Sequence, residues 1–247
     1  MSIPAFTLEG YRSTLTEILG RGYEVRSFHD VVAHHRHLVL RHDVDQSIAI
    51  ARELADFEAE QGWKSTWFIL VRTQMYNPFS RVNTSHLRAM SEAGHELGLH
   101  LDATYYEGSE RLQQGAAVEC EMLQNVLGLP IKLISFHRPA PTLVGSPMLI
   151  AGRKHTYMPC FMNEMGYSSD SRGEWKHGHP WQHEVLAKGQ ALQLLTHAVW
   201  WVGPDGQTPV ERLSGVIAGR TREIDAELSA NNQVWAKHRI CTDGVVE

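Results

Sequence analysis

The feature that most constrains the fold of this 247-residue chain is its alternation of short apolar runs with longer amphipathic segments. Strands that alternate with helices predict a mainly parallel sheet or a (β/α) barrel. Ser47 and Ser109 are the expected N-caps of two of the helices. The expected strands are 38–45, 66–71, 95–102 and 131–136, and the expected helices between them are 48–61, 85–93 and 110–127.

The pattern extends to both ends of the chain but loosens after Pro139. No linker, low-complexity stretch or internal repeat interrupts it, so we expect a single domain over residues 1–247. The remaining expected elements are a helix at 8–19, an extended piece at 23–28, strands at 166–171 and 191–197, and a closing helix at 209–229.

Composition narrows the class of protein. The net charge of −5 disfavours a nucleic-acid binder, which usually presents a basic face. The cysteines at 120, 160 and 241 are odd in number and form no CxxC motif, which favours a reducing compartment without a disulfide framework. Neither a secretory signal nor an apolar stretch of about 18 residues is visible, so we expect a cytoplasmic protein with no transmembrane segment.

Polar side chains gather where the expected strands end. In a parallel barrel the carboxyl ends of the strands meet at one face, where loop-borne chemistry collects. The chain also has 15 histidines, and histidine is the commonest metal ligand. The polar residues at strand ends are Asp43 and Asp45, His100 and Asp102, His137 and Arg138, Asp170, and His197.

The segment Asp43-Val44-Asp45 is the strongest local signal. Two carboxylates two residues apart on a strand point to the same face and repel each other, and a divalent cation removes that conflict. The alternative is a solvated strand end, or Asp45 as the cap of the next helix. His100 lies on an expected strand whose Gly98 leaves room for an approach to the backbone. A lone histidine would more often be a core residue, but the Asp-x-Asp strand favours a ligand.

Two further segments complete the candidate site. His137 can reach a metal or a carboxylate, while Arg138 could hold Asp43 ionised and be held in turn by Asp170, unless these form only a structural ion pair. His197 precedes Trp200 and Trp201, whose rings suit a sugar face or simply pack in the core. Trp175 is a third candidate for the floor of a sugar pocket. The histidines at 177, 179 and 183 are expected at the surface or at the pocket rim.

In their order and spacing these residues resemble the polysaccharide deacetylase family, also called the NodB-homology domain or carbohydrate esterase family 4. The resemblance runs from about Leu38 to Trp201. The motifs are the Asp43–Asp45 pair, the histidine motif 96–104, Arg138-Pro139, the aspartate–tryptophan segment 170–175, and Leu195-Thr196-His197.

The family resemblance implies a distorted (β/α) barrel of about seven strands and a divalent metal, most often zinc. By this resemblance Asp43 is the general base, Asp45 and His100 are metal ligands, and His197 is the general acid. The family's second histidine is replaced by Thr104. We therefore expect His137 as the third ligand, with His95 as the weaker candidate. The spacing of the aspartates leaves the base and ligand roles exchangeable.

The resulting hypothesis is a metal-dependent amide hydrolase. It would remove an acetyl or formyl group from an N-acylated amino sugar that is nucleotide-linked, lipid-linked or part of an oligosaccharide. The closest variants of the family point to bacterial surface-polysaccharide biosynthesis, including O-antigen and lipopolysaccharide. The first alternative is a catalytically inactive sugar- or metal-binding member of the same fold, acting in a biosynthetic complex. A metal phosphoesterase is the second, but no phosphate-cradling glycine loop is visible. The oligomeric state stays open.

Overall fold

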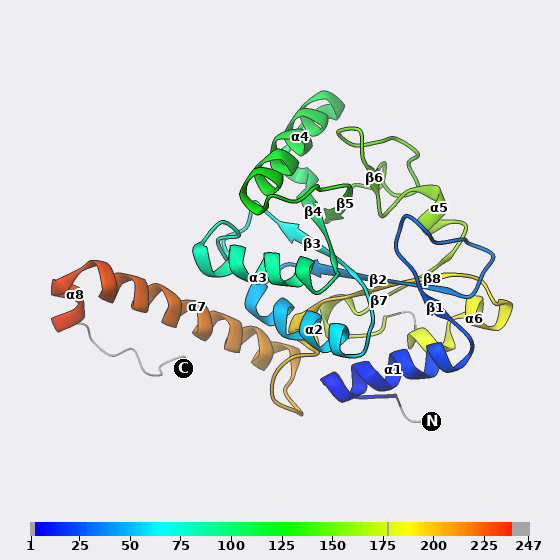
Figure 1. The fold of residues 1–247 in the computed structure, drawn as a ribbon, viewed down its shortest axis with the longest axis horizontal. Coiled ribbons are helices and arrows are strands. Elements are labelled where there is room, and N and C mark those ends of the chain that lie inside the picture. The colour runs from blue at the N-terminus through cyan, green and yellow to red at the C-terminus, as the bar shows by residue number, and fades with distance from the viewer. Residues whose placement is uncertain (1–2, 177, 239–247) are drawn as a thin grey trace.

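The computed structural model describes residues 3–176 and 178–238, and its centre is a parallel sheet (Figure 1). Every pairing between the described strands is parallel. The strands are β1 (Glu24–Val25), β2 (His37–Val44), β3 (Thr66–Leu70), β4 (Glu96–Asp102), β5 (Leu133–His137), β6 (Lys154–His155), β7 (Gly166–Ser169) and β8 (Leu192–Thr196).

Seven strands form a continuous path in the order β6-β5-β4-β3-β2-β8-β7, and β1 adds to the side of β2. The sheet curls, but the path ends at β6 and β7 without a pairing between these two described strands. The expectation of a distorted (β/α) barrel of about seven strands is confirmed. Parallel pairing brings the carboxyl ends of all seven strands to one end of the sheet.

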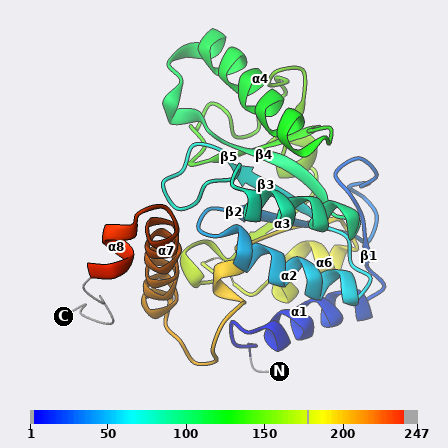
Figure 2. The same ribbon diagram turned by 60° about the vertical axis from the view of Figure 1, so that its left-hand side comes forward.

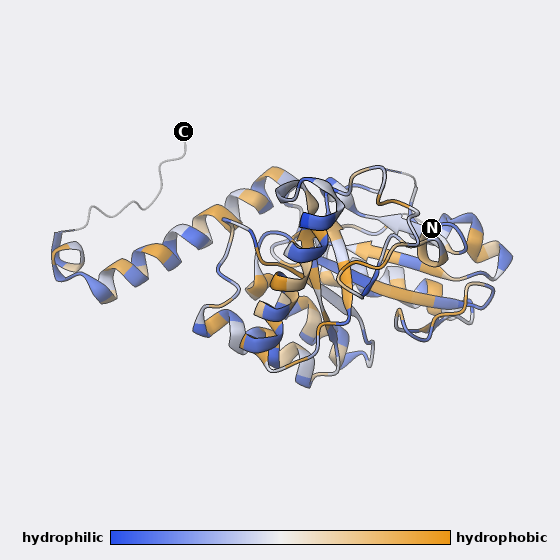
Figure 3. Cartoon of the chain, turned by 90° about the horizontal axis from the view of Figure 1, so that it is seen from above, coloured by the Kyte–Doolittle hydropathy of each residue, from blue (hydrophilic) through white to orange (hydrophobic). Residues whose placement is uncertain are grey.

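Helices cover the outside of the curled sheet, and α2 and α3 pack side by side, as Figure 2 shows. Their apolar residues face the strands, whereas their polar residues face outward; Figure 3 shows apolar colour along the strands and mixed colour along the helices. The helices are α1 (Leu8–Gly20), α2 (Ile48–Glu60), α3 (Arg81–Glu92), α4 (Gly108–Leu127), α5 (Pro159–Met162), α6 (Glu184–Lys188), α7 (Pro209–Asn231) and α8 (Gln233–His238).

The helix caps explain where the observed boundaries agree with the expected ones and where they differ. Ser47 caps α2, as expected, by accepting a hydrogen bond from the backbone N–H of Ile50. Ser80 caps α3, so that helix begins four residues before the expected start. The expectation that Ser109 caps α4 is wrong, because α4 already begins at Gly108.

Gly98 on β4 serves packing. A Cβ at this position would come within 2.5 Å of the Phe68 ring. What approaches the backbone beside His100 is therefore an aromatic side chain of the neighbouring strand β3.

The last long helix, α7, extends away from the sheet (Figure 1). Only its first turns, which carry Val210 and Leu213, reach the carboxyl ends of the strands. Among the described helices, none combines the length and apolar character that crossing a bilayer requires. Cys120 and Cys160 are free thiols, whereas Cys241 and His177 lie outside the described residues.

Candidate metal and catalytic centre

Three residues from the carboxyl ends of three strands converge on one point; Asp45, His100 and His137 are called the trio. Asp45 directly follows β2, His100 lies on β4, and His137 ends β5. The Oδ1 atom of Asp45 is 3.1 Å from Nε2 of His100 and 3.4 Å from Nδ1 of His137. One ligand atom from each residue lies within 4.8 Å of the other two. The candidate ligands singled out in the sequence are therefore neighbours in space.

The donor atoms of this trio fit a divalent cation. Asp45 Oδ1 is buried and has no hydrogen-bond partner among the described residues, although two imidazole nitrogens point toward it. Burial would raise the pKa of the Asp45 carboxyl, but the surrounding His100, His137 and His197 bring it well below its ordinary value. Two imidazoles and one carboxylate are a ligand set that zinc accepts in catalytic sites, with a fourth position left for water or substrate.

Asp43 is held by Arg41, its neighbour two positions back on β2. The guanidinium donates from Nε to Oδ1 at 3.0 Å and from Nη2 to Oδ2 at 2.7 Å. Burial would raise the pKa of Asp43, but Arg41 and His100 lower it below its usual value. Sequence reasoning missed Arg41, although strand alternation places residues 41, 43 and 45 on one face.

Ser135 on β5 joins Asp43 to His100. Its Oγ donates to Asp43 Oδ1 at 3.2 Å and accepts from Arg41 Nη2 at 2.6 Å. With the hydroxyl proton given to Asp43, the Nδ1–H of His100 donates to Ser135 Oγ at 3.1 Å. The Nε2 lone pair of His100 is then directed at the point shared with Asp45. Such outer hydrogen bonds fix the ring orientation and tautomer of a metal-binding histidine.

His197 is anchored by Asp170. Its Nδ1 lies 2.7 Å from Asp170 Oδ1, and its backbone N–H donates to Asp170 Oδ2 at 3.0 Å. Burial would lower the pKa of His197, but the Asp170 carboxylate and the nearby Asp45 raise it to about 9. The imidazole is therefore protonated at neutral pH. Its Nε2 lies on the side of the metal trio, 3.7 Å from Asp45 Oδ2.

Arg138 does not lie where the sequence placed it. Its side chain is 72% exposed and approaches Asp102 at 3.9 Å, whereas Arg41 occupies the place beside Asp43. Asp170 binds His197 and the indole N–H of Trp201 rather than Arg138. The expected chain from Asp170 through Arg138 to Asp43 is therefore wrong. Its physical reason is that Arg41, on the same strand face as Asp43, is already buried against that carboxylate.

The weaker candidate for the third ligand, His95, and Thr104, which replaces the family's second histidine, both have other partners. His95 directly precedes β4; its Nε2 is 2.9 Å from the Ala55 carbonyl and its Nδ1 is 2.8 Å from Ser65 Oγ. Thr104, in the place of the family's second histidine, donates its hydroxyl to Asp102 at 2.6 Å. Neither side chain belongs to the trio.

A cavity of about 740 Å³ opens over the trio and is lined by apolar and aromatic side chains. Of the three expected tryptophans, only Trp200 lines it. Trp201 is buried against Tyr11 and Phe6, and Trp175 stacks on Phe6, so their expected role as a sugar floor is replaced by core packing. Residues that sequence reasoning missed in the lining include Tyr157, Tyr167, Val210 and Leu213.

The histidine-rich loop does not form the rim of this cavity. His179 is buried, packs against Trp181 and has its pKa lowered by burial to about 4. His183 caps α6 by accepting from the backbone N–H of Val185. The expectation of surface or rim positions is wrong for His179.

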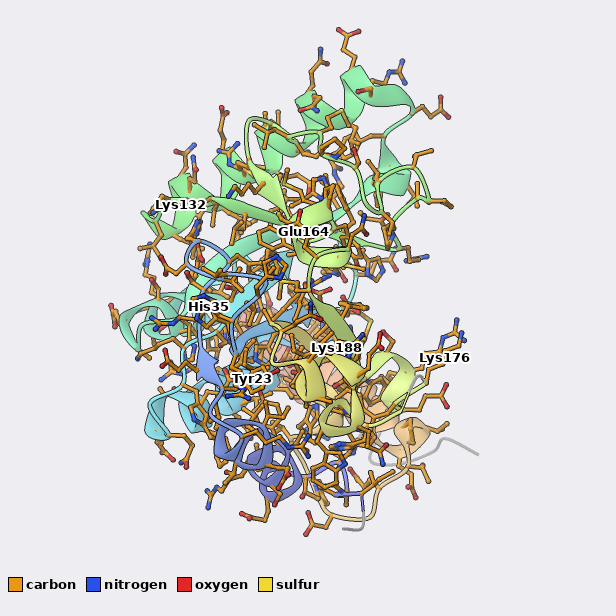
Figure 4. All side chains as sticks on the ribbon, turned by 90° about the vertical axis from the view of Figure 1, so that its right-hand side faces the viewer. Tyr23, His35, Lys132, Glu164, Lys176 and Lys188 are labelled. Atoms are coloured by element: carbon orange, nitrogen blue, oxygen red, sulfur yellow. The ribbon has the colours of Figure 1, made fainter. Side chains whose placement is uncertain are left out.

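The other end of the sheet carries a different hollow. His35 and Lys188, which face the viewer's side in Figure 4, precede β2 and β8 and so lie at the amino ends of the strands. No cluster of potential metal ligands other than Asp45, His100 and His137 occurs among the described residues. The candidate chemistry is therefore concentrated at the carboxyl ends.

No protein-family model and no curated protein matches the sequence. Solved polysaccharide deacetylases resemble the structure. One, from Bacillus cereus, is 14% identical, with a TM-score of 0.46 and coverage of 74% of this chain and 88% of that chain. A deacetylase from Streptococcus pyogenes in complex with acetate is 11% identical, with a TM-score of 0.45 and coverage of 87% and 89%.

A family 4 acetyl xylan esterase from Clostridium thermocellum, in complex with a cobalt ion, is 16% identical. Its TM-score is 0.41, with 75% of this chain and 84% of that chain covered.

Proposed function

We propose that this protein is a metal-dependent hydrolase that removes an N-acyl group from an amino sugar, as a divergent polysaccharide deacetylase of bacterial surface-polysaccharide biosynthesis. The observation that carries the proposal is the convergence of Asp45, His100 and His137 beside an arginine-held carboxylate and a protonated histidine. The five sequence motifs also support it, because they contain Asp45, His100 and His197.

Asp45, His100 and His137 would hold the cation, and zinc suits this ligand set best. When bound, the metal supplies polarisation of the acyl carbonyl and a lowered pKa of water. Ser135 orients His100 for this role through its hydrogen bond to Nδ1.

Asp43 acts as the acceptor for the proton of the attacking water. Its carboxylate lies 3.8 Å from His100 Nε2 and therefore borders the ligand trio. Arg41 keeps it ionised, since the lowered pKa of Asp43 leaves no proton on it near neutral pH. Asp43 accepts hydrogen bonds from Arg41 and Ser135, and these bonds fix the orientation of its carboxylate.

His197 acts as the general acid. An amine anion is a poor leaving group, so cleavage of the amide needs a proton on the sugar nitrogen. The imidazolium donates its Nδ1–H to Asp170, and its Nε2–H lies on the side of the trio. The pKa of about 9 keeps that proton available at neutral pH.

The cavity above these groups supports a sugar as substrate. Trp200, Tyr157 and Tyr167 contribute aromatic surface, which suits the C–H faces of a pyranose. Val210 and Leu213 from α7 close one side of the space.

The test is metal content measured together with acetate or formate release from N-acylated amino sugars. The protein purified after zinc loading is expected to hold about one zinc per chain and to release the acyl group. Zinc and sugar binding without any release, over a panel of N-acetyl and N-formyl amino sugars, would favour the inactive binding protein. Preferential hydrolysis of phosphate esters would instead favour a phosphoesterase.

A further inference from the structure

We propose that Arg138 and Arg172 make this site selective for amino sugars that carry an anionic group, either a phosphate ester or a carboxylate. This inference rests on the proposed function for the position of the acyl group, and it adds the chemical class of the substrate. Three observations support it: both arginines line the cavity, both are weakly paired with carboxylates, and both have a left-handed backbone conformation.

Both arginines line the cavity over the metal trio, and they come from different loops. Arg138 directly follows β5, and Arg172 lies in the turn Ser171–Gly173 that follows β7. β5 and β7 lie near opposite ends of the strand order. A sugar whose acyl group reaches the trio would therefore have a guanidinium available on two sides of its ring.

Arg138 also lines an adjoining hollow of about 530 Å³, which shares Asp45, Gln46 and His137 with the main cavity. Arg72 and Tyr105 lie in this second hollow. The two hollows together offer room beyond a single sugar. Arg72 is already paired with Glu119 at 2.7 Å and Asp102 also lines the second hollow, so the positive charge that an anionic substituent would meet there comes from Arg138.

The acids of the site are already matched by other groups. Arg41 holds Asp43, three histidines surround Asp45, and His197 with Trp201 holds Asp170. Arg138 has only a 3.9 Å contact with Asp102, and none of the ion pairs between described residues includes Arg172. Arg138 therefore has only this long contact with the buried Asp102, and both guanidinium groups are available to a ligand at the cavity mouth.

Both arginines also occupy backbone conformations that favour glycine. Their φ angles are 52° for Arg138 and 67° for Arg172, in the left-handed region. An L residue with a side chain pays for this conformation in stability, and such strain collects at binding and catalytic sites. A glycine would fit both positions more easily. Ala151 shares this conformation with φ 48°, so the backbone supports the proposal only together with the place of both arginines in the cavity lining. A planar guanidinium binds phosphate and carboxylate through two parallel hydrogen bonds.

The test compares binding of three sugars to the zinc-loaded protein by calorimetry. N-acetylglucosamine is the neutral probe, its 1-phosphate carries a phosphate ester, and N-acetylglucosaminuronic acid carries a carboxylate. We expect one of the two anionic sugars to bind at least about tenfold more tightly than the neutral sugar, because charge-assisted hydrogen bonds are worth that much. Which one binds identifies the source of the anion. Equal affinity for all three sugars, or no binding of any, would overturn the proposal.

Variants separate the arginines from the metal as the origin of the preference. Arg138→Gln and Arg172→Gln are each expected to lower the ratio of anionic to neutral affinity about tenfold, while Arg138→Lys keeps part of it. Arg111→Gln, at an exposed position on α4 that lines neither hollow, is the matched control and should leave the ratio unchanged. An unchanged ratio in both cavity variants would assign the preference to the metal and contradict the proposal.

Arg138→Gly distinguishes a role in ligand binding from a role in holding the loop, because it combines two measurements: unfolding temperature and anion preference. Glycine relieves the left-handed backbone, so the variant should unfold at the same or a higher temperature than the parent protein. It should nevertheless lose the anion preference as Arg138→Gln does. A destabilised variant that keeps the preference would show that Arg138 serves the loop and not the ligand. Because all these measurements report binding, they stay informative even if no hydrolysis is found.

Discussion

At the scale of single residues, the proposed metal site depends on three side chains that converge on one point. Asp45→Ala and His100→Ala each remove one donor from the trio, so we expect zinc content to fall from about one per chain to background after dialysis. Asp43→Asn should retain zinc and lose turnover, because Asp43 lies beside the trio and is bound to Arg41. Elemental analysis and an acyl-release assay on the same preparations measure both quantities.

His34→Ala is the control for these ligand variants, since His34 is exposed and precedes β2 at the far end of the sheet. It should match the parent protein in zinc and in turnover. Full zinc occupancy in both Asp45→Ala and His100→Ala would remove the ligand assignment.

Ser135 gives a second prediction, because it acts through His100. Ser135→Ala removes the oxygen that accepts from His100 Nδ1 and the hydroxyl that donates to Asp43. We expect zinc affinity to fall about 10- to 100-fold, the usual cost of losing an outer hydrogen bond at a metal site. Competition with a chelator of known affinity measures this, with Ser169→Ala, whose hydroxyl hydrogen-bonds with Ser171 and not with a residue of the trio, as the control. Unchanged affinity would separate Ser135 from the metal.

The third prediction concerns the acid. Asp170→Asn keeps a side chain of the same shape but removes the charge that raises the pKa of His197. We expect kcat to fall about 10²- to 10⁴-fold, the range associated with general acid–base catalysis, while zinc content stays at about one per chain. A rate close to that of the parent protein would contradict the role of His197 as proton donor.

The sequence predicted part of the candidate site, and strand alternation accounts for only some of it. Strand alternation placed Asp43 and Asp45 on one face, whereas the ligand roles of Asp45 and His100 came from the family resemblance and His137 was proposed because Thr104 replaces the family's second histidine. Alternation could also have found Arg41, which shares a face with Asp43. The exposed position of Arg138 and the core packing of Trp175 and Trp201 could not be read from the pattern, because they depend on how loops fold back and on Phe6 near the amino end.

At the scale of elements, α1, α2 and β2 are joined by a buried polar network on the face of the sheet opposite the site. Glu58 on α2 accepts from Tyr11 on α1, lies 2.9 Å from His42 Nε2 on β2, and accepts from Ser65 at 2.6 Å. Burial would raise the pKa of Glu58, but His42 and His95 lower it. Removing the charge in Glu58→Gln should cost about 3 kcal/mol of unfolding free energy, the scale for breaking a buried pair.

The pH dependence of stability follows from the same network. Burial lowers the pKa of His95, so the unfolded chain binds more protons below about 6.5, and the free energy of unfolding falls as the pH drops through that value. The lowered pKa of Glu58 adds stability above about 4.3 that is lost at more acidic pH. Urea unfolding at pH 7, 6 and 5 should show the first decrease. Burial also lowers the pKa values of His155 and His179 to about 4, so His95→Gln should lessen the decrease without abolishing it. An equally steep decrease in His95→Gln would assign it to other groups.

The order and type of the elements were predictable because apolar runs and helical periods alternate so regularly. Their boundaries were not. Ser80 starts α3 early by capping Asn83, while Glu107 precedes α4 without any side-chain cap, so the expected Ser109 cap does not form. Cap choice depends on the direction from which the chain enters the helix, which residue type alone does not determine.

At the scale of the whole molecule, a curled parallel sheet gathers five separated segments at one end. Residues 43–45, 100, 137, 170 and 197 are distant in sequence, and the parallel order of β5, β4, β2, β8 and β7 makes them neighbours. The first turns of α7 close the side of the cavity that the strands leave open. This arrangement separates a rigid ligand set on strand ends from loops that can vary with the substrate.

Anomalous diffraction at the zinc edge, from crystals of the zinc-loaded protein, tests the proposed metal site most directly. We predict one strong peak within bonding distance of Asp45, His100 and His137, with Asp43 and His197 beside it and outside the coordination shell. A peak elsewhere, or a fully occupied zinc that excludes Asp45 or His100, would contradict it.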